Sequence, residues 1–329
     1  MTSLSVVLLF ASASHSQDIH FSQYLSSPAI LNPAFTGDFK GDYRLTGNFR
    51  NQWNSITVPY RTVGLTVDAA HFLTKPNLGV GISIYDDLTG DSEYNTTTVV
   101  LSGAYAYPLT RDSAQKIHFG LQPSYVLQSL NTSALYFDNQ YNGQLGKFDP
   151  TLPSGEAFSV NNVQWVTMAA GLRYSYVLDS RNKLDVGLAG FNLIGSDNTL
   201  ESSSTRLQRR YNFHGNVQFK ALQKLDLIPG FLYTSQGKSK NLISGISGRY
   251  LYNASTAIHA GFWYRNRDAG FFTAGLTYQT LYIGLSYDMT TSKLREASNG
   301  RGAFELSIIY VFRKFRMIDG KYMTCPNYL

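Results

Sequence analysis

The sequence has few charged residues and almost no cysteine. Asp, Glu, Lys and Arg make up 15% of its 329 residues, and Cys325 is the single cysteine. One cysteine excludes an internal disulfide. Low charge combined with 14% aromatic residues argues against a disordered chain. The net charge of +6 is spread along the sequence without a Lys- or Arg-rich block, which argues against nucleic-acid binding.

Long apolar runs are also missing. No run of about 18 apolar residues follows the first few positions, so the sequence predicts no transmembrane helix. Residues 1–16 contain a short apolar core, 4–13, followed by small residues, although no Lys or Arg precedes the core. We interpret residues 1–16 as a secretory signal peptide that is cleaved before Gln17.

What the sequence does have is alternation with a period of two. Every second residue of 281–289 is apolar or aromatic: Leu281, Ile283, Leu285, Tyr287 and Met289. The intervening residues are small or polar, and 304–312 repeats the pattern. Successive side chains of a strand point to opposite faces, so this pattern predicts strands with one apolar and one polar face. Such strands are typical of a transmembrane β-barrel, with lipid outside and a polar lumen inside.

We predict an all-β fold, a transmembrane antiparallel β-barrel of about fourteen strands, over residues 42–315. The predicted strands are 42–54, 59–73, 77–86, 94–108, 115–130, 162–178, 183–194, 210–222, 224–235, 241–252, 255–265, 269–279, 280–290 and 302–315.

The long connections between these segments all follow odd-numbered strands. The connections after even-numbered strands are short, such as 74–76 and 179–182, whereas 131–161, 195–209 and 291–301 follow odd-numbered strands. Outer-membrane barrels have short periplasmic turns and longer external loops. We therefore expect an outer-membrane location with both termini in the periplasm, where residues 316–329 form a C-terminal tail.

Local catalytic motifs are absent. The sequence contains no HExxH pattern, no Cys/His pair and no phosphate-binding loop that leads into a helix. His118, His214 and His259 lie on the polar faces of separate predicted strands. We predict a protein that is not an enzyme, with no catalytic, cofactor-binding or metal-binding residues. A barrel enzyme that assembles its site across strands is the alternative, and it predicts loss of a hydrolytic activity when these histidines are mutated.

Residues 17–41 do not alternate and precede the first strand. Asn32-Pro33 favours a turn, Gly37 permits a positive φ, and the aromatic side chains of this stretch need a place to be buried. We expect a short periplasmic N-terminal segment that caps the periplasmic mouth of the barrel or docks a partner; one segment can do both.

This stretch resembles the N-terminal signature of the PorP/SprF family, outer-membrane proteins of the type IX secretion and gliding machinery of Bacteroidetes. The positions that match are Phe21, Gln23, Tyr24, Pro28, Asn32, Pro33, Ala34, Gly37, Arg50, Gln52 and Trp53. Near the other end, the positions similar to family motifs include Tyr287, Asp288, Glu305, Cys325 and Pro326. The chain departs from the family ending at Asn327 and Tyr328.

The resemblance implies a non-enzymatic component that supports export or surface anchoring of proteins with C-terminal sorting domains, such as adhesins. Its partners would be outer-membrane lipid, exported cargo at the external loops and periplasmic components of the secretion system. The residues themselves leave a second function open, a porin-like channel for small solutes, because a fourteen-strand wall is wide enough to enclose a lumen.

Overall fold

The computed structural model describes most of the chain between Asp18 and Arg313. The described ranges are 18–52, 59–75, 77–90, 94–131, 135–144, 146–149, 151–155, 162–194, 197–198, 205–206, 208–292, 295–298 and 300–313. The predicted signal peptide, the predicted C-terminal tail and the motif residues Trp53, Cys325 and Pro326 lie outside them.

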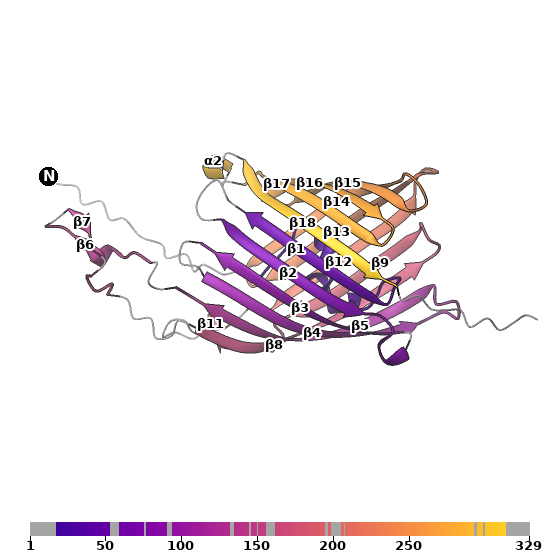
Figure 1. Ribbon diagram of the computed structural model, residues 1–329, viewed down its shortest axis with the longest axis horizontal. Helices are drawn as coiled ribbons and strands as arrows, with labels where there is room; N and C mark the ends of the chain where they lie inside the picture. The colour runs from indigo at the N-terminus through magenta and orange to yellow at the C-terminus, as the bar shows by residue number, and fades with distance from the viewer. Residues whose placement is uncertain are drawn as a thin grey trace, which may run out of the picture.

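Fourteen strands close into an antiparallel barrel (Figure 1). Each strand pairs with its neighbours in chain order, and β1 pairs with β18 to close the wall, with Tyr43 opposite Phe312. Closure pairs the backbone groups of every strand, which a wall that faces lipid requires. The bounds are β1 (Tyr43–Gln52), β2 (Tyr60–Ala69), β3 (Leu78–Thr89), β4 (Tyr94–Pro108), β5 (Gln115–Ser129), β8 (Asn162–Val177), β9 (Lys183–Phe191), β12 (Arg210–Lys220), β13 (Leu225–Gln236), β14 (Ser239–Leu251), β15 (Thr256–Arg265), β16 (Ala269–Tyr278), β17 (Leu281–Thr290) and β18 (Arg301–Phe312).

The predicted fold class is confirmed, and each predicted strand matches one strand of the wall. The ends differ by a few residues, as for the last strand, predicted over 302–315 and observed as Arg301–Phe312. The alternation also holds. On β17, Leu285 and Tyr287 are exposed on the outer face, whereas Ser286 and Asp288 are buried inside. The period of two in the sequence therefore separates the lipid face from the lumen face.

The two rims of the barrel differ. One rim has only short connections. The long connections, 130–161, 192–209 and 291–300, all lie at the other rim, on the left of Figure 1, where β6 and β7 stand away from the wall, and short ones such as 237–238 and 266–268 lie there too. The remaining elements outside the lumen are η3 (Phe72–Thr74), η5 (Asp138–Gln140), β6 (Tyr141–Asn142), β7 (Lys147–Phe148), β10 (Asp197–Asn198), β11 (Thr205–Arg206) and α2 (Arg295–Ser298). Within the described residues, no helix is long and apolar enough to cross a membrane.

The apolar core of the protein lies inside the barrel. Residues 18–41, which we call the lumenal segment, contain η1 (Tyr24–Ser26), α1 (Pro28–Leu31) and η2 (Pro33–Phe35). Tyr24 and Leu31 pack with Trp263 and Phe271 of the wall, and Phe21 packs with Tyr85 in a second cluster. The lumenal segment therefore packs against the inner face of the wall and fills part of the lumen.

Candidate functional site

The lumenal segment runs through the barrel from one rim toward the other. At its start, Asp18 accepts a hydrogen bond from the Nδ2 of Asn192 at 2.8 Å and receives another from Gln236, both at the long-loop end of their strands. Immediately after its end, the backbone N–H of Asp42 donates to the carbonyl of Phe312 at 2.9 Å, at the short-turn rim.

This position differs from the expectation of a segment that caps the periplasmic mouth, with both termini on the short-turn side. β18 does end at the short-turn rim, but Asp18 lies near the opposite one. The physical reason is that the hydrogen-bonding and ionic partners of this stretch are wall residues along the whole lumen. The segment therefore lies along the lumen and not only at its mouth.

Local sequence explains the shape of the segment. Pro28 and Pro33 occupy the first positions of α1 and η2, where a missing N–H costs nothing. The side-chain oxygen of Asn32 accepts a hydrogen bond from the N–H of Ala34 at 2.9 Å and so caps η2. Gly37 has a φ of +72°, and a Cβ there would lie 2.4 Å from Cα of Gly79. The Asn-Pro-Ala and Gly positions are therefore required by a tight path beside the wall.

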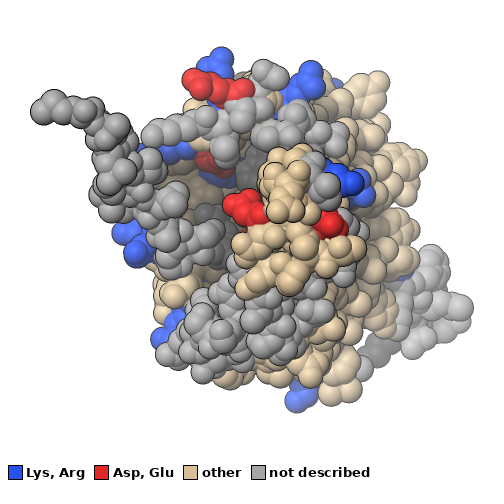
Figure 2. All heavy atoms as spheres, turned by 90° about the vertical axis from the view of Figure 1, so that its left-hand side faces the viewer, with Lys and Arg blue, Asp and Glu red and all other residues tan. Residues whose placement is uncertain are grey.

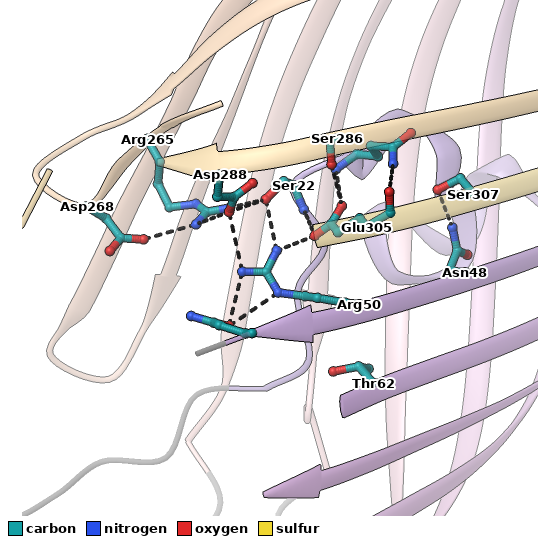
Figure 3. A network of polar contacts seen from close by, with 12 residues as sticks. Ser22, Asn48, Arg50, Thr62, Arg265, Asp268, Ser286, Asp288, Glu305 and Ser307 are labelled. Carbon is teal, nitrogen blue, oxygen red and sulfur yellow. Dashed lines mark hydrogen bonds and ion pairs between the residues drawn. The ribbon is translucent and has the colours of Figure 1, made fainter. Parts of the chain in front are cut away.

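An ionic cluster binds the start of the segment (Figure 3). We define it as Ser22, Arg50, Arg265, Asp288 and Glu305. The backbone N–H groups of Ser22 and Gln23 donate to the two carboxylate oxygens of Glu305, at 2.7 and 2.9 Å. The hydroxyl of Ser22 donates to Asp288 at 2.7 Å. Residues that are 283 positions apart in the sequence are thus joined by direct hydrogen bonds.

The ionic cluster is buried, and the positive charges of its two arginines equal the negative charges of its two carboxylates. Arg50 pairs with Glu305 and lies 3.5 Å from Asp288, while Arg265 lies 3.3 Å from Asp288 and 3.0 Å from the half-exposed Asp268. Both arginines also donate to the Ser22 hydroxyl. All four buried charged side chains are at most 3% exposed, so each depends on its partners to offset the loss of water.

Glycines of the wall receive the middle of the segment. Gly120, Gly171 and Gly187, on β5, β8 and β9, form what we call the glycine floor. A Cβ on Gly120 would lie 2.3 Å from the backbone of Pro33 and Ala34, and one on Gly171 would lie 1.9 Å from the Asn32 oxygen. The Nδ2 of Asn32 donates to the carbonyls of Leu172 and Leu188, at 3.2 and 3.1 Å. Only glycine permits this approach.

The last part of the segment contacts a second set of charges. Asp38 pairs with Arg173, whose guanidinium lies 4.2 Å from the ring centre of Phe35. The N–H of Gly37 donates to Asp68 at 2.7 Å, and Asp68 also pairs with Arg44. Start, middle and end of the segment are therefore each bonded to a different part of the wall.

Most of the predicted motif residues meet in the lumen. Phe21, Tyr24, Pro28, Asn32, Pro33 and Ala34 are buried there, and Gln23, Arg50, Gln52, Asp288 and Glu305 lie in or beside the ionic cluster. Tyr287 does not join them, because it is on the lipid face and 45% exposed.

Sequence reasoning did not single out Ser22, Arg265 or the glycine floor as part of this site. Arg265 is visible as a charged residue on a lumen face, and the three glycines occupy inward positions of their strands. What the sequence does not reveal is which stretch of chain they face.

The three histidines have separate partners. His118 contacts Ser175 at 2.9 Å, His214 contacts Asn32 at 3.2 Å and His259 contacts Thr277 at 2.8 Å. Among the described residues, no group of three His, Cys, Asp or Glu side chains is placed to hold a metal ion.

Between the segment and the long-loop rim lies a cavity of about 810 Å³, which we call the vestibule. Its lining includes Asp18 and His20 of the segment, and Thr96, Gln122 and Trp165 of the wall. Figure 2 views the molecule from this rim.

Solved structures with a similar fold are outer-membrane channels and transporters. The toluene transporter TbuX of Ralstonia pickettii matches with a TM-score of 0.51 and 13% identity, over 86% of this chain and 93% of that one. The CymD monoaromatic hydrocarbon channel gives 0.51 and 12%, over 88% and 94%. A FadL homologue of Pseudomonas aeruginosa gives 0.50 and 12%, over 88% and 94%. The chain is therefore an outer-membrane β-barrel protein in its fold.

Sequence comparison adds the family. The sequence-family model named type IX secretion system membrane protein PorP/SprF matches residues 13–310 of the chain. The chain belongs to this family, which confirms the resemblance seen in its motifs. No curated protein matches the chain.

Proposed function

We propose that this protein is a non-enzymatic component of type IX secretion that holds exported proteins, or supports their export, at the long-loop rim. The expected cargo is a protein with a C-terminal sorting domain, of the adhesin type. Membership of the PorP/SprF family supports a role in type IX secretion. Function of this kind needs a stable barrel with binding surfaces on its loops.

The observation that carries this proposal is the occupied lumen. The segment is bonded to Glu305 at its start, to the carbonyls of Leu172 and Leu188 at its middle and to Asp68 near its end. A wall that binds a stretch of its own chain along its length is suited to anchoring and poorly suited to diffusion. The alternative, a porin-like channel for small solutes, has in its favour the vestibule and the similarity in fold to the toluene transporter TbuX and the CymD monoaromatic hydrocarbon channel.

The longest connection supplies a candidate docking arm. Within 131–161, β6 and β7 form a small hairpin that stands away from the barrel (Figure 1). Tyr136 packs edge-on against Phe148 with ring centres 4.8 Å apart, yet Tyr136 is 76% exposed and Tyr141 is 57% exposed. Exposed aromatic side chains on a preformed arm are the type of residue that dominates protein interfaces.

In the proposed orientation the long-loop rim faces the outside and the short turns face the periplasm. The short turns, together with residues 316–329, would meet periplasmic components of the secretion system. Orientation by loop length follows the general pattern of outer-membrane barrels.

Deletion of the arm tests the proposal. Replacing 132–160 by a short Gly-Ser linker should leave a folded barrel, seen as heat-modifiable migration, and should abolish cargo display at the cell surface. A control variant receives the same linker between Arg111 and Asp112, in a turn at the other rim, and should retain display. Unchanged display in the folded deletion variant would contradict the proposed role of the arm.

A further inference from the structure

The vestibule has a polar wall with little charge along six consecutive strands of the barrel. Over β1–β5 and β8, its described lining contains one carboxylate, Asp87, and one guanidinium, Arg50. Asp87 accepts a hydrogen bond from Thr62, and Arg50 is paired within the ionic cluster. Most of the other lining residues on these strands carry hydroxyl or amide groups: Gln52, Thr62, Thr96, Thr98, Gln128 and Thr167.

Two nearly buried side chains on this wall hold polar atoms without a partner among the described residues. The Oε1 of Gln122 and the indole Nε1 of Trp165 have none, although these side chains are 4% and 6% exposed. They lie on the adjacent strands β5 and β8 and both line the vestibule. On β14, the Oδ1 of Asn241 is also buried without a partner among the described residues, and Asn241 lines the vestibule. Buried polar groups normally find partners, and the exceptions frequently mark sites where a ligand or water supplies one.

The size and chemistry of the cavity limit the ligand. A volume of about 810 Å³ lies within the range of roughly 300–1,000 Å³ that is usual for small-molecule sites. Hydroxyl and amide side chains can pair with ligand hydroxyls as donors and as acceptors. The rest of the lining adds Asp18, which pairs with Arg210, Asp268, which pairs with Arg265, and the exposed Lys240. Because most of these charges are already paired, a charged ligand would find few free opposite charges in the vestibule. An extended peptide would normally bind by adding to a sheet edge, and the closed wall offers none.

We propose that the vestibule binds a neutral oligosaccharide, with Gln122 and Trp165 as hydrogen-bonding residues. This binding is separate from the proposed anchoring role and does not depend on it. The segment residues Asp18 and His20, which line the same cavity, would form the floor on which the ligand rests.

The test is titration of the full-length protein with maltohexaose, cellohexaose and N-acetylchitohexaose. It should be carried out in a detergent without a sugar headgroup, so that the detergent does not occupy the site. Calorimetry should detect binding of at least one of these saccharides, with a change in the fluorescence of Trp165. Gln122→Leu and Trp165→Phe should each weaken that binding about tenfold, the effect of one lost hydrogen bond. Trp165→Phe should also remove the fluorescence change.

Thr277→Val is the matched control. It removes a lumen hydroxyl at the short-turn end, where Thr277 contacts His259, and should leave the affinity unchanged. If one vestibule variant does not fold, as judged by heat-modifiable migration, the other still decides the result. The proposal is overturned if no saccharide binds, if folded vestibule variants bind as tightly as the parent, or if an uncharged Gly-Ser-Asn hexapeptide binds the same site more tightly.

Discussion

The wall holds the start and the middle of the lumenal segment by different physical means. On β1, β15, β17 and β18 the ionic cluster holds it by charge, through Glu305, Asp288 and two arginines. On β5, β8 and β9 the glycine floor holds it by shape, because missing Cβ atoms let Asn32, Pro33 and Ala34 approach the wall. The first region consists of large polar side chains, and the second depends on their absence.

The difference shows how one segment can be both specific and tightly packed. Charge-assisted hydrogen bonds fix the register of the segment along the lumen, since Glu305 binds two consecutive N–H groups. Close packing on glycine fixes its depth against the wall. Loss of the ionic cluster or of the glycine floor should release the segment. The loss in the free energy of unfolding should be larger for the ionic cluster, and only there should a second substitution, of the partner charge, reduce it.

The largest effect is expected from Glu305→Ala. It would leave Arg50 buried without its main partner and would remove the acceptor of the Ser22 and Gln23 N–H groups. Breaking a buried ion pair from one side costs about 3–5 kcal/mol. The free energy of unfolding in urea measures the loss, and Glu296→Ala, in the exposed part of α2, is the control. An equal, small effect of both substitutions would show that the cluster does not hold the segment.

A double-mutant cycle sharpens this side of the comparison. Arg50→Ala combined with Glu305→Ala should destabilise the protein less than the sum of the two single changes, because neither charge is then left alone. Coupled pairs of this kind deviate from additivity by about 0.5–3 kcal/mol. Strict additivity would mean that the two residues act independently.

A smaller loss is expected from Gly120→Ala. The added methyl group would lie 2.3 Å from backbone atoms of Pro33 and Ala34, which cannot rotate away as a side chain can. Overpacking of this type costs about 1–3 kcal/mol. Gly47→Ala is the matched control, since a Cβ there meets no atom within 4 Å. Increased cleavage of the segment by added protease should accompany the loss in Gly120→Ala only.

The smallest effect is expected from Tyr287→Phe. Tyr287 belongs to the C-terminal motif by sequence, but it is on the outer face, next to residues of the cluster and not within it. A surface substitution away from buried networks usually changes the free energy of unfolding by less than about 0.5 kcal/mol. A loss as large as that of Glu305→Ala would place Tyr287 in the same functional unit.

The fold could be predicted from the sequence because lipid and lumen impose opposite demands on successive residues. The alternation of Leu285 with Ser286, and of Tyr287 with Asp288, is a local signal that one strand shows by itself. The pairing of β1 with β18 follows once the strands are counted and a closed wall is required.

The site could be predicted only in part, because its contacts join distant stretches of the chain. The motif residues of the N-terminal stretch and of β17 and β18 were identified by resemblance, but their meeting at Ser22 could not be seen in the sequence. The direction of the segment was also missed. No local pattern says that Asp18 reaches Asn192 and Gln236 at the far rim, because that depends on the shape of the whole lumen.

The most direct test of a bonded, occupied lumen is the conductance of the intact, folded protein in planar lipid bilayers. We predict no steady conductance, because the segment is bonded to the wall at its start, middle and end. Steady ohmic channels formed by the full-length protein, with the segment protected from protease, would contradict this prediction and favour a porin-like channel.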